Sequence, residues 1–365
     1  MVYPFLSHAI KLDFERLIGP VEKCGRALSR LDERLRRSPD LAEGFRIRSH
    51  FWEAHATSWL EGELVPMEDL VLHEAKTDVR LPTQELGRAH HFLQLRKRVD
   101  RHEQGWCLET ASLMKLAGHG NDEIDSKPSR YETVDPEHDD HETWAALFAD
   151  LDEVSKRTDA LISGNIAEFD TGAKIQMSAQ EQSRHNALDQ WCQLQGMVAH
   201  YPPQLAAAIL LDAWLSLIPI ENQARLGRLM AADYLRTEIC PNHLPLVAYG
   251  LYRSSFRWRR TDPLHTRLVM LLAGFEKGAE QGMEQLNRLA MAQDHMARAC
   301  AGRRKNSRLP DFAALFIANP YVSIPMARKK LDVTAAAIDR MIEQMGPAMP
   351  RELTGRGRYR AWGIV

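Results

Sequence analysis

The sequence is poor in cysteine and has no long hydrophobic run. Its five cysteines lie far apart, and no two form a Cys-x-x-Cys pair. This spacing argues against a disulfide framework or a zinc ribbon and predicts a reducing compartment. The best apolar stretch, LAAAILLDAWLSLI, contains Asp212 and falls short of the roughly 20 residues that span a bilayer. The first residues lack the charged and apolar blocks of a signal peptide, so we expect a cytoplasmic protein without a membrane partner.

No excess of one charge marks the whole chain, because 47 Lys and Arg balance 49 Asp and Glu. The hydrophobic content of 44% and the charged content of 26% are those of an ordinary globular protein. The charge is nevertheless uneven, since residues 301–365 hold 12 Lys and Arg against 5 Asp and Glu. Such asymmetry between parts of a chain predicts a nucleic-acid partner for the basic end.

Strand patterns are almost absent from the first part of the chain, where apolar residues recur at helical spacing. Leu28, Leu31 and Leu35 form one such stripe. Further helices are predicted over 203–216, 224–237, 263–300 and from about residue 143. A Gly-, Asp- and His-rich stretch over 118–142 predicts a linker. We therefore expect a mainly α fold.

Three parts are expected along the chain. They are an N-terminal helical region (1–120), a helical core (121–300) and a small C-terminal domain (301–365). The last part has three short helical patterns and then two β-prone runs around Gly355 and Gly357, which are the elements of a winged helix-turn-helix. Ser323 and Thr334 are the expected N-caps of its second and third helices.

The third of these helices has an apolar face at i, i+3, i+4 and i+7, formed by Ile338, Met341, Ile342 and Met345. The expected DNA-contacting residues lie on its outward face, in the preceding helix and in the hairpin: Arg328, Lys329, Lys330, Thr334, Ala335, Ala336, Arg340, Arg356, Arg358 and Arg360. The small alanines allow close approach to base edges, and the cations hold the DNA backbone. Asp339 and Glu343 count against this interpretation because they repel phosphate. The alternative is a small helical domain with a basic surface used for protein contacts.

The stretch LIPIENQARLGRL, residues 217–229, joins two predicted helices. It resembles the signature loop of Fic-domain proteins, HPFxxGNGRxxR. On this resemblance Arg225 and Arg228 match the two family arginines, and Glu221 occupies the position of the acidic Mg²⁺ ligand. Asn222, Gln223 and Ala224 replace the Gly-Asn-Gly phosphate cradle. The catalytic histidine is missing, because the chain has none between His200 and His243.

A second stretch, HATSWLEGELV at 55–65, resembles the inhibitory helix motif of the same family, (S/T)xxxE(G/N). Its matching residues are Thr57, Glu61 and Gly62. The resemblance implies that Glu61 pairs with Arg228, that the body is a Fic-like helical bundle, and that transferase chemistry is lost. Two roles remain open for the degenerate loop: a structural one, and residual binding of a nucleotide, phosphate or Mg²⁺.

The acidic and histidine residues of 135–142 crowd onto one polar stretch without the spacing that fixes a metal's geometry. A solvated linker is the preferred interpretation, and no metal site, cofactor or catalytic residue is predicted. The sequence therefore predicts a transcriptional regulator that binds double-stranded DNA as a homodimer. The alternatives are a divergent nucleotidyl- or phosphoryl-transferase that uses Glu221, Arg225 and Arg228, and a protein-interaction module.

Overall fold

This computed structural model describes residues 3, 12–77, 81–117, 179–217, 223–254, 257–302, 307–354 and 360–364, with backbone only for 179–185. The predicted linker over 118–142, with its acidic and histidine residues, and the helix predicted from residue 143 lie outside these ranges. The contacts reported below lie within residues 1–122 and 184–365, which form one unit. No helix in the part that the structure describes is long and apolar enough to cross a membrane.

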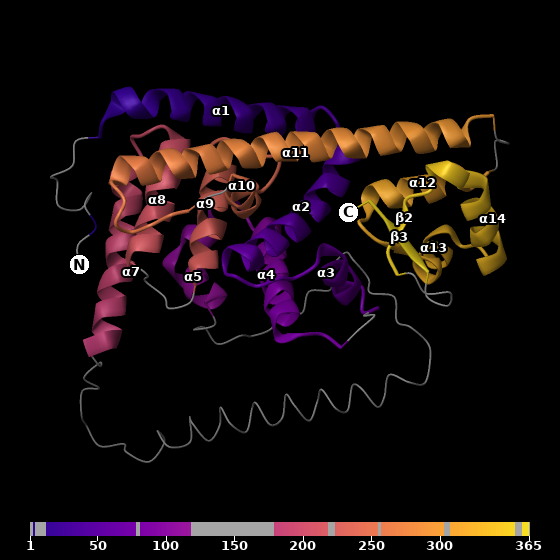
Figure 1. Cartoon of the computed structure of the whole chain (residues 1–365), viewed down its shortest axis with the longest axis horizontal. Helices are drawn as coiled ribbons and strands as arrows, with labels where there is room; N and C mark the ends of the chain where they lie inside the picture. Colours follow the sequence, from indigo (N-terminus) through magenta and orange to yellow (C-terminus); the bar gives the residue numbers. More distant parts are fainter. Residues whose placement is uncertain are drawn as a thin grey trace, which may run out of the picture. The chain divides into compact units, whose positions relative to one another are not determined.

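Helices dominate the described residues, which confirms the mainly α prediction (Figure 1). The helices of the body are α1 (Phe14–Arg36), α2 (Pro39–Leu60), α3 (Met67–Glu74), α4 (Gln84–Arg101), η2 (Trp106–Leu108), α5 (Thr110–Leu116), α7 (Ala179–Val198), α8 (Pro203–Leu217), α9 (Ala224–Glu238), α10 (Val247–Arg253) and α11 (Leu264–Cys300). The helices predicted over 203–216, 224–237 and 263–300 thus appear as α8, α9 and α11.

The first helix, α1, lies along the long helix α11 (Figure 1). The predicted apolar stripe of Leu28, Leu31 and Leu35 is buried in this contact region, as burial of one helix face requires. Gly282 of α11 allows the close approach, because a Cβ atom there would lie 2.6 Å from Leu31 Cδ2. Two segments about 250 residues apart in sequence therefore form one wall of the body.

Helix α8 is buried on nearly all sides, from Gln204 to Trp214. Such a helix belongs to the centre of a core rather than to its surface. Trp214 Nε1 donates to the Gln223 carbonyl oxygen at 2.9 Å, and Trp191 Nε1 donates to the Leu210 carbonyl oxygen at 3.0 Å. These bonds satisfy both indole N–H groups inside the apolar core.

Helices α10 and α11 cross in backbone contact. A Cβ atom added to Gly250 would lie 2.1 Å from the Gly274 carbonyl oxygen, and one added to Gly278 would lie 2.1 Å from the Leu246 carbonyl oxygen. Only glycine permits an approach this close, since any side chain must overlap the opposite backbone. The glycines therefore set the distance between the two helices.

The C-terminal block comprises the described residues of 307–364. It contains α12 (Leu309–Ala318), β1 (Val322–Ser323), α13 (Ile324–Leu331), α14 (Ala335–Met345), η3 (Gly346–Ala348), β2 (Arg351–Glu352) and β3 (Ala361–Gly363). The strands form an antiparallel sheet in the order β1-β3-β2, with Val322 paired to Trp362 and Glu352 paired to Trp362. The predicted helices and hairpin strands are confirmed.

Strand β1 differs from the prediction, which placed Val322 and Ser323 at the start of a helix. Ser323 has an extended backbone because it is the N-cap of α13, with φ −97° and ψ 163°. An N-cap residue takes non-helical angles, so the residue before it is free to pair with β3. The cap was recognised in the sequence, but its pairing partner lies some 40 residues further along the chain.

The C-terminal block is held against α2 by a buried arginine. The Arg48 guanidinium donates to the carbonyl oxygens of Phe316 at 2.5 Å, Ile317 at 2.7 Å and Asn319 at 2.7 Å, and to that of Ile364 at 2.9 Å. Carbonyls at a helix C-terminus lack partners within the helix and carry partial negative charge. Burial lowers the Arg48 pKa to about 9. One side chain thus satisfies the end of α12 and ties the block to the body.

Candidate functional site

The helix-turn-helix geometry of the C-terminal block comes from two capped helices and a left-handed turn. Ser323 Oγ accepts from the Met326 backbone N–H, and Thr334 Oγ1 accepts from the Ala337 backbone N–H, both at 3.3 Å. Both predicted N-caps are therefore confirmed. Between the helices, Asp332 has φ 52° and ψ 55° and ends α13 in the left-handed conformation. This turn allows α14 to begin only three residues after Asp332.

Helix α14 buries the predicted apolar side and exposes the opposite one. Ile338, Met341 and Met345 are buried, and Ile342 is half-buried. Exposed positions on this helix and its cap include Thr334, Ala335, Ala336, Asp339 and Arg340. The exposed N-terminal end is therefore small and uncharged, which suits contact with base edges.

The predicted basic residues differ in how free they are. Arg328, Lys329 and Lys330 are exposed at the end of α13. Lys330 Nζ is 3.5 Å from Asn319 Oδ1, and partial burial lowers the pKa of Lys330. Arg340 Nε donates to the Ala336 carbonyl oxygen at 3.1 Å, along its own helix. Arg328 and Lys329 are thus the most direct candidates for phosphate contact.

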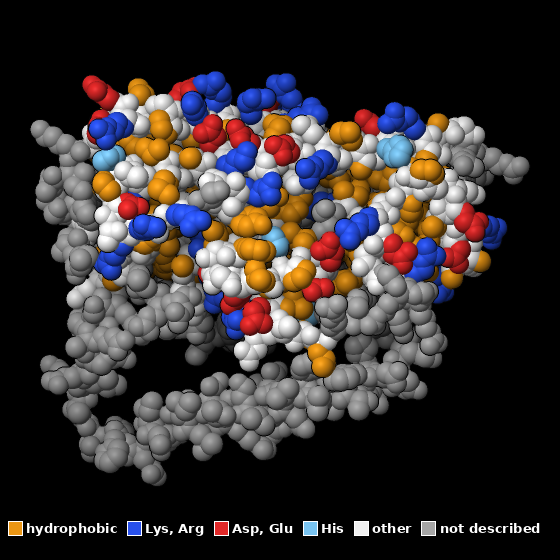
Figure 2. All heavy atoms as spheres, viewed as in Figure 1, with side chains coloured by type: hydrophobic (Ala, Val, Ile, Leu, Met, Phe, Trp, Pro, Cys, Tyr) orange, Lys and Arg blue, Asp and Glu red, His pale blue; other side chains and the backbone are white. Residues whose placement is uncertain are grey.

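The hairpin arginines are only partly described. Arg356 and Arg358 lie outside the described residues. The Arg360 guanidinium stacks on Trp362 at 4.8 Å from the ring centroid and lies 3.5 Å from a Glu352 carboxylate oxygen. Figure 2, which shows one face of the molecule, has both acidic and basic side chains over α13 and α14. A single patch of positive charge is not visible on that face.

The Fic-like resemblance placed Glu61 beside Arg228, and the structure does so. Arg228 Nη2 lies 2.7 Å from Glu61 Oε1, with 7% of the arginine side chain and 26% of the glutamate side chain exposed. Burial lowers the Arg228 pKa, and the negative charge of Glu61 opposes this effect. The pair joins the C-terminal end of α2 to the first turns of α9.

The other residues of the two motifs have structural surroundings of their own. Gly62 has φ 85°, so it ends α2 in a conformation that favours glycine. Gly227 packs against an indole ring, because a Cβ atom there would lie 2.4 Å from Trp214 Cδ1. Thr57 is buried, and its Oγ1 has no hydrogen-bond partner among the described residues.

The degenerate loop itself is described only from Gln223 onward, and Glu221 and Asn222 lie outside the described residues. Gln223 Oε1 accepts from Arg225 Nε at 3.1 Å. His91 of α4 was given no role by the sequence analysis, yet it lies near this loop. Burial lowers the His91 pKa, and the Arg225 charge lowers it further. A sequence separation of more than 130 residues hides this proximity.

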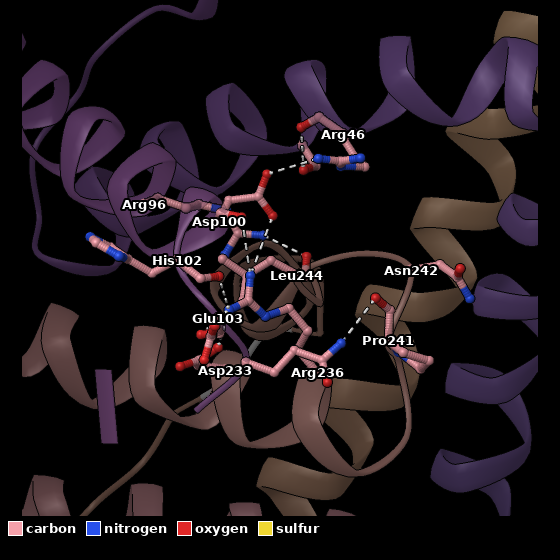
Figure 3. A network of polar contacts seen from close by, with 12 residues as sticks. Arg46, Arg96, Asp100, His102, Glu103, Asp233, Arg236, Pro241, Asn242 and Leu244 are labelled. Atoms are coloured by element: carbon pink, nitrogen blue, oxygen red, sulfur yellow. Dashed lines mark hydrogen bonds and ion pairs between the residues drawn. The ribbon is translucent and has the colours of Figure 1, made fainter. Parts of the chain in front are cut away.

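A network of buried charged residues ties α2, α4 and α9 together (Figure 3). Arg96 donates from Nη2 to the Leu244 carbonyl oxygen at 2.7 Å and lies 3.4 Å from Glu53 Oε2. Arg236 lies 2.8 Å from Asp233 Oδ1 and donates to the Glu103 carbonyl oxygen at 3.0 Å. Burial raises the Glu53 pKa, which the Arg96 charge opposes. Each charge has a partner, so the network holds helices and connectors in place.

Comparisons with known proteins agree with the geometry of the C-terminal block. Residues 309–365 match the family described as "HTH DNA binding domain", so the chain is a helix-turn-helix protein with a DNA-binding domain. Residues 178–301 match "Protein of unknown function (DUF1612)". The chain belongs to the same family as the "Uncharacterized protein y4cF" of Sinorhizobium fredii (strain NBRC 101917 / NGR234). The two are 33% identical over 382 residues, covering 97% of this chain and 98% of that protein.

The matched families describe the C-terminal block more fully than the body. The DUF1612 range contains the degenerate loop and Arg228. Its description names no fold and no activity. The Fic resemblance of the body therefore stays a prediction, as do the three domain boundaries.

Proposed function

We propose that this chain is a transcriptional regulator that binds double-stranded DNA as a homodimer in the cytoplasm. The helix-turn-helix match over 309–365 carries the proposal. The exposed alanines at the start of α14 and the exposed Arg328 and Lys329 support it, because they suit base contact and phosphate contact respectively. Two-fold symmetric DNA sites favour a dimeric protein.

We further propose that residues 1–300 form a Fic-like body, with the predicted division at about 120, that no longer transfers a nucleotide. The Glu61–Arg228 pair at 2.7 Å supports this proposal, because it occupies an arginine that the family's phosphate loop would need. The sequence supports it too, since no histidine lies in the loop. The body then supplies dimerisation or sensing.

DNA binding is expected to be steeply salt-dependent, with Arg328 and Lys329 contributing part of the slope. Each phosphate contact adds roughly 0.9 to the slope of log K against log salt. The double variant Arg328→Ala, Lys329→Ala is therefore expected to reduce the slope by about 2. Fluorescence anisotropy with a labelled random duplex over a salt series measures it.

A matched control removes two exposed arginines of α1, Arg26 and Arg36, which lie 63% and 61% exposed. The net charge then changes equally, but the slope should stay at the wild-type value. Absence of DNA binding at low salt would reject the regulator and favour a protein-interaction module. Size-exclusion chromatography with light scattering tests the dimer independently.

Freeing Arg228 is not expected to create transferase activity. In Glu61→Gln the side chain keeps its size but loses its charge, so Arg228 becomes available to an anion. Without a histidine in the loop, no group removes the proton from an attacking hydroxyl. Labelled ATP should therefore transfer no label to candidate targets, either from wild type or from Glu61→Gln. Transfer that appears in this variant would favour the alternative of a divergent transferase.

A further inference from the structure

Three side chains with metal-binding atoms meet inside the body. Asp32 comes from α1, and Cys240 and His243 come from the connector between α9 and α10. One potential ligand atom of each lies within 4.8 Å of those of the other two. All three residues are buried. Since α1 and the connector are some 200 residues apart in sequence, only the fold brings this set together.

The Asp32 carboxylate fixes the connector and orients the histidine. It accepts from the Asn242 backbone N–H at 3.0 Å and from Asn242 Nδ2 at 2.7 Å. His243 Nδ1 lies 2.9 Å from Asp32 Oδ1. A carboxylate next to a histidine ring nitrogen fixes both the orientation and the tautomer of the ring, as it does around protein-bound metals.

The remaining histidine nitrogen points to an unfilled role. The His243 side chain is 0% exposed, and its Nε2 has no hydrogen-bond partner among the described residues. Leaving a buried polar atom without a partner costs about 1–3 kcal/mol. If Asp32 only held the connector in place, this nitrogen would carry that cost without return. A bound ion near the cluster gives a use to the set as a whole.

The ligand types select a particular class of ion. Thiolate, imidazole and carboxylate are the ligands of Zn²⁺, whereas Ca²⁺ and Mg²⁺ prefer oxygen alone. A thiolate from Cys240 and a carboxylate from Asp32 together neutralise a dication, which permits its burial. The Cys-x-x-His spacing of Cys240 and His243 supplies two ligands from one short segment, as in structural zinc sites.

We propose that Asp32, Cys240 and His243 bind a structural zinc ion that fastens the α9–α10 connector to α1. Coordination uses the Cys240 thiolate, so the thiol proton is released to solvent when the ion binds. The site is independent of DNA binding and of the degenerate loop. Its expected effect is on the stability of the body.

The full chain purified without chelator is expected to hold about one zinc per chain by mass spectrometry of the metal content. After removal of zinc, Co²⁺ provides a direct probe, because cobalt bound to a thiolate gives a charge-transfer absorption band. This band should appear in the wild-type protein and be lost in Cys240→Ser. Affinity should fall in that variant by at least the 10–100-fold that loss of a metal's outer partners causes.

Cys107→Ser is the matched control, since Cys107 is also buried but lies outside the cluster. It should keep both the zinc and the cobalt band. Asp32→Asn covers the case in which Cys240→Ser fails to fold, and circular dichroism verifies folding of each variant. A folded wild-type protein that binds no zinc and shows no thiolate–cobalt band overturns the proposal, as does a band that persists in folded Cys240→Ser.

Discussion

Replacing Arg48 with methionine is expected to release the C-terminal block from α2. Methionine keeps the apolar stem but has no donor for the carbonyl oxygens of Phe316, Ile317, Asn319 and Ile364. Each buried carbonyl left without a donor costs about 1–3 kcal/mol. We therefore expect a loss of roughly 3 kcal/mol or more in the free energy that docks the block.

Hydrogen exchange measured by mass spectrometry resolves this loss along the chain. Amides of α12 should exchange faster in Arg48→Met, while those of α4 keep their wild-type rates. Arg48→Lys should give an intermediate effect, because an ammonium group donates to fewer of these carbonyls at once. Arg46→Met is the matched control on the same helix, since the Arg46 side chain is 41% exposed and its ion pairs are long. Equal exchange in Arg48→Met and wild type would show that Arg48 does not hold the block.

The second large effect is expected at the crossing of α10 and α11. A methyl group in Gly278→Ala would lie 2.1 Å from the Leu246 carbonyl oxygen, so the backbones must separate. Overpacking in a core costs typically about 1–3 kcal/mol, and a collision with backbone rather than a flexible side chain lies at the upper end. We expect the free energy of unfolding to fall by roughly 3 kcal/mol. Urea unfolding followed by circular dichroism measures it.

Gly87→Ala provides a control with the opposite sign. Gly87 is exposed within α4, and a Cβ atom there would meet nothing within 4 Å. Alanine in a helix is more favourable than glycine by about 0.5–1 kcal/mol, so this variant should gain stability. If Gly278→Ala also gained stability, the two helices would have to be further apart than the structure shows.

The sequence predicts those parts of the fold that depend on neighbouring residues. Helix α14 is an example, because its cap at Thr334 and its apolar face lie within a dozen residues of each other. Strand β1 could not be predicted in this way, because Val322 is extended only to pair with Trp362. Hydrogen bonds between distant strands leave no periodic pattern in either segment.

The same limit applies to the candidate sites. The pairing of Glu61 with Arg228 was anticipated only through a family resemblance, since 167 residues separate them. Cys240 and His243 share a visible Cys-x-x-His spacing, but Asp32 gives no signal of its own. Arg48 lies in a charged helix segment, and nothing nearby indicates that it is buried against carbonyls of α12. Burial of a charge is a property of the assembled fold.

The contact of α1 with α11 has a consequence for how the chain folds during synthesis. The apolar face of Leu28, Leu31 and Leu35 leaves the ribosome long before its partner helix, which ends at Cys300. At roughly 5–20 residues per second, that face waits more than about ten seconds for α11. During this interval the nascent chain exposes an apolar stripe that a chaperone recognises. Nucleation must therefore begin elsewhere, and the N-terminal helix joins the body late although it is made first.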